Sequence, residues 1–272
     1  MEKMNPFEKI RYIEIETHSA CNRKCNWCLF GAHPNFRPKK QQFLEDEYIL
    51  SVLYDLKENS FSGVIGFFSI NEPLMDLRIA EGTLFRKSKQ ILGNNVLFSI
   101  TTNGDLLNDD LVTRLFESGL DFMKISCYEI ERYEKLNHLY KDNSRIIVLN
   151  QTRYNFGEYE SNRGGSLTTS HLITNYNSCY FPQYRIVIGW DGEVRICYHD
   201  ILQRIKLGNV KHCSLPSILN SSQYAQLVHD IQYSRQSVFP CSICNVCGNE
   251  KKFLDSNEAI LKQLEKNYDQ NE

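Results

Sequence analysis

The sequence lacks an excess of charge of either sign, and it lacks any long hydrophobic run. Its 31 Lys and Arg residues nearly balance 33 Asp and Glu residues, for a formal net charge of -2. This balance argues against nucleic acid or an anionic membrane as partner, since both require a basic surface. The longest apolar run, GVIGFFSI, is far shorter than the roughly 20 residues that span a bilayer, and the start MEKMNPFEKI has no apolar stretch resembling a signal peptide. We expect a cytoplasmic protein with a small-molecule or short-peptide substrate.

Cysteine is plentiful, with ten residues in the chain. Because disulfides are rare in a reducing compartment, grouped cysteines are first interpreted as metal or redox ligands. The stretch CNRKCNWC sets Cys21, Cys25 and Cys28 at C-x3-C-x2-C spacing. Three thiolates suit an iron-sulfur cluster with one iron left open, but a zinc site completed by His18 or His33 remains an alternative.

Apolar segments with strand-like patterns alternate with segments of helical periodicity over the first 150 residues. The expected strands are 10–17, 63–70, 95–101, 120–126 and 145–150, and the expected helices are 44–58, 76–91, 108–118 and 129–140. Such alternation predicts a parallel sheet with helical crossovers, hence an α/β fold built as an open or incomplete barrel. In such folds the active residues lie in loops after the strands, where the cysteines and the segments SINEPL and TTNGD are found.

The pattern changes past residue 165. The segment RIVIGWDGEVRIC predicts two short strands around an Asp191-Gly192 turn, and the tail at 251–268 has the spacing of an amphipathic helix. We therefore expect two domains, 1–165 as the barrel and 166–272 as a smaller C-terminal lobe.

CNRKCNWC resembles the C-x3-C-x-aromatic-C signature of the radical S-adenosylmethionine (SAM) superfamily. In that family the open iron of a 4Fe-4S cluster chelates SAM, and an electron from the cluster yields a 5'-deoxyadenosyl radical. The resemblance implies that INEP (70–73) replaces the family's Gly-Gly-Glu-Pro loop, which binds the SAM amino group. Both glycines are absent here, so Glu72 and the backbone carry over most firmly. The cofactor-binding residues implied are Trp27, Asn71, Glu72, Thr102, Asn103 and Ser126.

The later cysteines resemble the SPASM/Twitch extension of this superfamily, which holds an auxiliary 4Fe-4S cluster. The implied ligands are Cys179, Cys197, Cys241 and Cys244, with Cys247 as a replacement for Cys241. A full SPASM lobe holds two auxiliary clusters, and the spacing here is abbreviated, so we expect the one-cluster Twitch form. A zinc ribbon is the alternative.

Few residues separate Ser126 from residue 165, so the barrel should be a shortened partial TIM barrel. A trimmed core with a one-cluster lobe is similar to the aminocyclitol dehydrogenases of the superfamily, which oxidise a secondary alcohol to a ketone. The resemblance implies that Arg163 faces the substrate hydroxyl or the SAM carboxylate. It also implies that the auxiliary cluster accepts an electron, and that a reductant such as flavodoxin or ferredoxin supplies the first one.

Other functions remain open at this stage. A radical epimerase would return hydrogen from a thiol, for which Cys127, Cys213 and Cys247 are candidates. A maturase of a ribosomally made peptide would use the same two lobes, although only about a dozen residues precede the first strand, which favours a small substrate. A zinc-binding or electron-transfer module is the non-enzymatic alternative.

Overall fold

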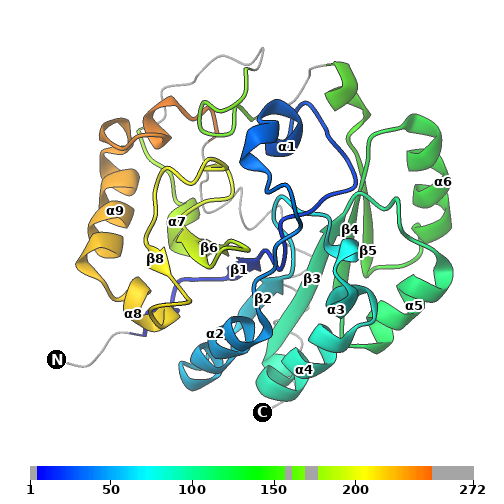
Figure 1. Ribbon diagram of the computed structural model, residues 1–272, viewed down its shortest axis with the longest axis horizontal. Coiled ribbons are helices and arrows are strands. Elements are labelled where there is room, and N and C mark those ends of the chain that lie inside the picture. The colour runs from blue at the N-terminus through cyan, green and yellow to red at the C-terminus, as the bar shows by residue number, and fades with distance from the viewer. Residues whose placement is uncertain (1–4, 157–160, 169–176, 247–272) are drawn as a thin grey trace.

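One sheet of eight strands forms the centre of the protein, whose computed structural model describes residues 5–156, 161–168 and 177–246 (Figure 1). Its order is β5-β4-β3-β2-β1-β6-β7-β8. The strands are β1 Tyr12–Ile15, β2 Gly63–Gly66, β3 Val96–Thr102, β4 Phe122–Cys127, β5 Ile146–Asn150, β6 Arg185–Ile188, β7 Glu193–Arg195 and β8 Gly208–Asn209. The α-helices are α1 Leu29–Ala32, α2 Asp46–Glu58, α3 Leu77–Ala80, α4 Thr83–Leu92, α5 Asp109–Glu117, α6 Ile130–Tyr140, α7 Phe181–Tyr184, α8 Leu215–Leu219 and α9 Ser222–Tyr233.

The strands from β5 through β1 to β6 are all parallel, and α2, α4, α5 and α6 lie along the outer side of the sheet (Figure 1). Packing between the layers is apolar: Phe98 of β3 meets Phe85 of α4 edge-on, with ring centroids 6.4 Å apart. Strand β6, the next described strand after β5 along the chain, pairs with β1 on the side opposite β2. The predicted α/β fold with a shortened partial barrel is thereby confirmed.

All four residues of strand β1 are buried, although its alternation of apolar and polar residues is typical of a strand with one solvated face. Tyr12 and Glu14 lie on the face opposite the helices, which we call the inner face. Glu14 is 3 % exposed and Glu16, just past the strand, is 2 % exposed. The polar residues of β1 thus face the interior of the open barrel, and its apolar residues face the helix-covered core. Neither face meets solvent, because β1 is a central strand.

The helix expected over 76–91 is interrupted. Helix α3 ends at Ala80 and α4 begins at Thr83, with Gly82 between them at a φ of 71°. A β-carbon at Gly82 would lie 1.9 Å from the hydroxyl oxygen of Ser118. Glycine is required at this position for both its left-handed conformation and its close approach to the chain after α5.

The C-terminal segment extends the same sheet. Strands β6 and β7 form the hairpin predicted around Asp191 and Gly192, and β8 pairs with β7 in antiparallel fashion. The domain boundary at residues 165 and 166 stays a prediction, and the helix expected at 251–268 lies outside the described residues. Within those residues, no helix is both long and apolar enough to cross a bilayer.

A buried ion pair joins β1 to β7 across the sheet. Arg195 Nη2 lies 3.3 Å from Glu16 Oε2, and the two side chains are 1 % and 2 % exposed. Burial raises the pKa of Glu16, while the guanidinium of Arg195 and two backbone amides oppose that rise. The carboxylate is stabilised in the core only while these donors surround it.

We predict that Arg195→Met destabilises the protein by about 3–5 kcal/mol, because it leaves a buried carboxylate without its cation. Urea unfolding of the anaerobic holoprotein measures the loss. Lys87→Met is the matched control: it breaks the exposed Lys87–Asp46 pair and should cost less than about 1 kcal/mol. Equal losses in the two variants would contradict the role given to the buried pair.

Candidate active site

Three loops that follow β1, β2 and β3 converge on a cavity of about 410 Å³, called the main cavity here. All but one of the cofactor, first-cluster and catalytic residues expected from the sequence line it: Cys21, Cys25, Trp27, Cys28, Asn71, Glu72, Thr102, Asn103, Ser126 and Arg163. The exception is Cys127. Parallel strands place their carboxyl ends at one edge of the sheet, which is why residues so distant in sequence meet there.

Glu72 is the most constrained polar residue of this site. Thr102 Oγ1 donates to its Oε1 at 2.7 Å, and the Asn103 amide donates to its Oε2 at 2.8 Å. The Leu74 amide donates to Oε1 at 3.2 Å. Burial raises the pKa of Glu72, and these three hydrogen bonds oppose the rise. The carboxylate is thus held in one orientation at the cavity wall.

The loop that carries Glu72 is fastened by Glu16, a residue that the sequence analysis did not single out. Glu16 Oε1 accepts hydrogen bonds from the amides of Ile70 and Asn71 at 3.0 and 3.1 Å. Its other oxygen faces Arg195. A charged residue at alternate positions of a buried strand, as in the segment YIEIE, was the available signal for this role.

The first cysteine loop is compact because α1 packs against it. The Cys28 amide donates to the Cys25 carbonyl at 3.0 Å, and a β-carbon on Gly31 would lie 2.1 Å from that carbonyl oxygen. The three thiols are half-buried at the main cavity. Burial raises the pKa of Cys21 and Cys25 to about 11. Cluster ligation would compensate by binding the thiolate form, so this donor set fits a 4Fe-4S cluster.

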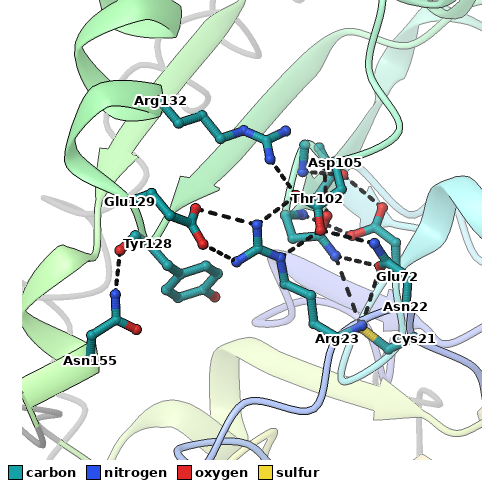
Figure 2. Close-up of polar contacts among 12 residues, drawn as sticks. Cys21, Asn22, Arg23, Glu72, Thr102, Asp105, Tyr128, Glu129, Arg132 and Asn155 are labelled. Atoms are coloured by element: carbon teal, nitrogen blue, oxygen red, sulfur yellow. Dashed lines mark hydrogen bonds and ion pairs between the residues drawn. The ribbon is translucent and has the colours of Figure 1, made fainter.

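Arg23, within the same loop, anchors it to the ends of β3 and β4 (Figure 2). Its guanidinium pairs with Asp105 at 2.5 Å and with Glu129 at 2.8 Å. Arg132 of α6 pairs with the same Asp105. Asn22 donates to Asp105 at 2.9 Å. This network neutralises Arg23 and fastens the cysteine loop to the segments that follow β3 and β4.

Trp27 packs among aromatic rings rather than standing alone at the cavity. Its ring centroid lies 5.1 Å from that of Tyr128 and 5.8 Å from that of Tyr154. Tyr128 follows β4, and its burial raises its pKa to about 12. These rings give one end of the main cavity an apolar wall, which suits a nucleobase.

The histidines of the zinc alternative are engaged elsewhere. His18 is fully buried, and its Nε2 forms a hydrogen bond of 3.0 Å with the Glu72 carbonyl oxygen. His33 Nε2 lies 2.7 Å from the Ser166 carbonyl oxygen. Neither residue lines the main cavity.

A second group of four cysteines lines one pocket, the auxiliary pocket: Cys179, Cys197, Cys241 and Cys244. Cys179 and Cys244 are buried. Burial raises the pKa of Cys197 and, to about 12, that of Cys241, and in both cases the neighbouring thiols add to the rise. Four mutually close thiols match the one-ligand-per-iron demand of a cubane. Among the described residues, no three His, Cys, Asp or Glu side chains are placed to hold one metal ion. A cubane differs from such a site because each thiolate binds a different iron.

The remaining expected residues fall in different places. Cys127 is fully buried in the hydrophobic core, and its carbonyl accepts from the Gln151 amide at 2.8 Å. Cys213 is exposed. Cys247 lies outside the described residues, so the choice between Cys241 and Cys247 stays a prediction.

Comparison with known proteins agrees with this geometry. Residues 15–148 match the family model of the radical SAM superfamily, and residues 179–248 match that of the SPASM iron-sulfur cluster-binding domain. The chain is 24 % identical over 249 residues to an S-adenosyl-L-methionine-dependent 2-deoxy-scyllo-inosamine dehydrogenase from Niallia circulans, covering 87 % of this chain and 92 % of the relative.

Two solved structures share the fold. BtrN in complex with AdoMet and 2-DOIA superposes with a TM-score of 0.74 at 22 % identity, covering 90 % of this chain and 95 % of that one. anSMEcpe with bound AdoMet has a TM-score of 0.53 at 16 % identity, covering 93 % and 98 %.

The partial barrel with its cysteine loop and the later cysteine pocket define a radical SAM enzyme with an auxiliary cluster domain. The chain belongs to the radical SAM superfamily and carries a SPASM-type domain at 179–248. Its cofactors are SAM and 4Fe-4S clusters, as the sequence predicted.

We predict that Cys25→Ala lowers the iron content of the reconstituted protein from about eight to about four atoms per chain, since one cubane loses a ligand. Iron analysis and electron paramagnetic resonance of the reduced protein measure this. Cys213→Ala, which removes an exposed thiol, should keep the full iron content. Stoichiometric zinc in the wild-type protein would contradict the assignment.

Proposed function

We propose that this enzyme is a SAM-dependent dehydrogenase that oxidises a secondary alcohol of a small molecule to a ketone. Residues 1–165 form the SAM-binding core in this proposal, and 166–272 form the auxiliary domain. The dehydrogenase relative supports it by its alignment over nearly the whole chain. When bound, SAM and the first cluster would supply abstraction of the hydrogen atom on the carbinol carbon, the auxiliary cluster would accept the second electron, and the hydroxyl proton would leave to solvent; flavodoxin or ferredoxin would supply the starting electron.

One observation carries the oxidative assignment: adjacent residues face the two sites. Cys197 lines the auxiliary pocket, and the next residue, Tyr198, lines the main cavity. The same holds where the chain passes from Arg163 to Gly164. An electron leaving a substrate in the main cavity therefore has to pass only the thickness of one peptide segment to reach the auxiliary pocket.

The proposed cofactor-binding roles follow from the side chains. Cys21, Cys25 and Cys28 hold the first cluster, and Cys179, Cys197, Cys241 and Cys244 hold the auxiliary one. Glu72, fixed by its three donors, receives the SAM amino group. The other residues assigned to SAM are Trp27, Asn71, Thr102, Asn103 and Ser126, all at the wall of the main cavity.

Arg163 is the proposed positioning group for the alcohol. Its backbone adopts a φ of 49°, which is uncommon outside glycine, and its guanidinium carbon lies 5.8 Å from the centroid of the Tyr198 ring. Its amide donates to Ser161 Oγ at 3.0 Å. The guanidinium is thus directed to the part of the main cavity nearest the auxiliary pocket, where it donates to the substrate hydroxyl.

Of the three candidate hydrogen donors for an epimerase, Cys127 and Cys213 lie within the described residues and their placement favours oxidation, while Cys247 lies outside those residues. An epimerase needs a hydrogen-donating thiol beside the substrate, and the catalytic candidate Cys127 is enclosed in the core while Cys213 is on the surface. Neither lines the main cavity.

We predict that Cys197→Ala still forms 5'-deoxyadenosine but makes little oxidised product, because the first cluster is intact and the electron acceptor is damaged. Anaerobic assays that quantify both products measure the split. Cys213→Ala should keep both rates. Full product formation by Cys197→Ala would refute the acceptor role.

We also predict that deuterium at the carbinol carbon of a turned-over substrate appears in 5'-deoxyadenosine, since that hydrogen is the one removed. Mass spectrometry of the nucleoside and of the product measures the transfer. Recovery of a product with unchanged formula and solvent hydrogen at that carbon would establish epimerisation instead.

A further inference from the structure

Charged side chains that the proposed reaction leaves unassigned line the main cavity on the inner face of the sheet. They are Glu14 of β1, Lys124 of β4 and Arg185 of β6. The register places Arg185 directly beside Tyr12, and Lys124 beside Thr101, which also lines the cavity. All of these side chains therefore share one chamber with the proposed SAM-binding residues.

Arg185 is enclosed by two aromatic rings and has one carboxylate partner. Its guanidinium carbon lies 4.5 Å from the ring centroid of Tyr12 and 4.8 Å from that of Tyr198, so two rings enclose it. Its nearest carboxylate oxygen is Glu14 Oε1, 3.5 Å from Nη2. That distance is longer than a charge-assisted hydrogen bond. A planar guanidinium fixed by aromatic rings is suited to bidentate recognition of an oxyanion.

The other two charged side chains at the main cavity, Arg23 and Glu72, have partners of their own in the loops. Arg23 is paired with Asp105 and Glu129, and the oxygens of Glu72 accept three hydrogen bonds. What remains is a set of three cations facing one carboxylate: Lys124, Arg163, Arg185 and Glu14. The inner face therefore carries more cations than carboxylates.

The pKa of Lys124 reflects this excess of cations. Burial and the positive charge of Arg185 together lower it to about 8, and the opposing effect of Glu14 is smaller than that of Arg185. An ammonium in such surroundings gains from any anion that enters the chamber.

We propose that Lys124 and Arg185 bind an oxyanion group, a carboxylate or a phosphate, that the alcohol substrate carries. As a description of the substrate, this rests on the proposed dehydrogenase function. Arg163 then meets the reacting hydroxyl, while the anionic group is anchored at β4 and β6. A substrate whose only charge is a cationic amine would meet uncompensated positive charge in this chamber.

Equilibrium dialysis of the anaerobic holoenzyme, saturated with SAM, tests the site. Labelled inorganic phosphate and labelled acetate are the probes, used in parallel. We expect saturable binding of one anion per chain, weakened at least about ten-fold in Lys124→Met and in Arg185→Gln, since each removes a charge-assisted contact. Lys135→Met, which removes an exposed lysine of α6, is the matched control and should bind like wild type.

The two probes also separate the two ligand classes: tighter binding of phosphate points to a phosphate ester, and tighter binding of acetate points to a carboxylate. SAM affinity and iron content show whether each variant is folded, and either variant alone suffices if the other is not. The proposal is overturned if neither anion binds saturably. It is equally overturned if folded variants bind them unchanged, or if a parallel dialysis without SAM shows anion binding that saturating SAM abolishes, which would assign the cations to the SAM carboxylate.

Failure of this inference is distinguishable from failure of the proposed function. Anion binding that depends on Lys124 and Arg185, with no alcohol oxidised, would keep the site and refute the dehydrogenase. Oxidation of an alcohol without such anion binding would do the reverse.

Discussion

The arrangement of the active site depends on Glu16, a carboxylate buried at the end of the central strand. One oxygen faces Arg195 of β7 and the other accepts the amides of Ile70 and Asn71. A single side chain thus connects the core strand, the loop that carries Glu72 and the hairpin that leads to Cys197. Because removal of any donor would leave an uncompensated buried charge, these three parts keep a fixed relation.

Two kinds of charged residue surround the main cavity, and they differ in how far they are neutralised. Arg23 is bound by two carboxylates and serves to hold the cysteine loop. Lys124 and Arg185 face a single carboxylate between them. Charges that are satisfied within the protein position the loops, whereas charges that are not satisfied are suited to a ligand. The same cavity therefore contains charged residues that position its loops and charged residues that are available to attract a ligand.

The proximity of the two cysteine sites follows from the way the later segment joins the sheet. Strand β6 pairs with β1 in parallel, so the hairpin that bears Cys197 and Tyr198 is an extension of the barrel wall. In the turn that follows β7, Cys197 lines the auxiliary pocket and Tyr198 lines the main cavity. This gives the auxiliary pocket and the main cavity a common wall.

The sequence by itself determined the local features: the spacing of Cys21, Cys25 and Cys28, the alternation of strands and helices, and the polar loops that follow the strands. These features depend on periodicity and on neighbours a few residues away, which a linear pattern records. Only the tertiary structure decided that Glu14 and Glu16 point inward, that β6 lies beside β1 and that Lys124 and Arg185 share a single carboxylate. Arg195 and Glu16 are 179 residues apart, and no local propensity selects such a partner, because the energy of a buried charge depends on everything that folding places around it.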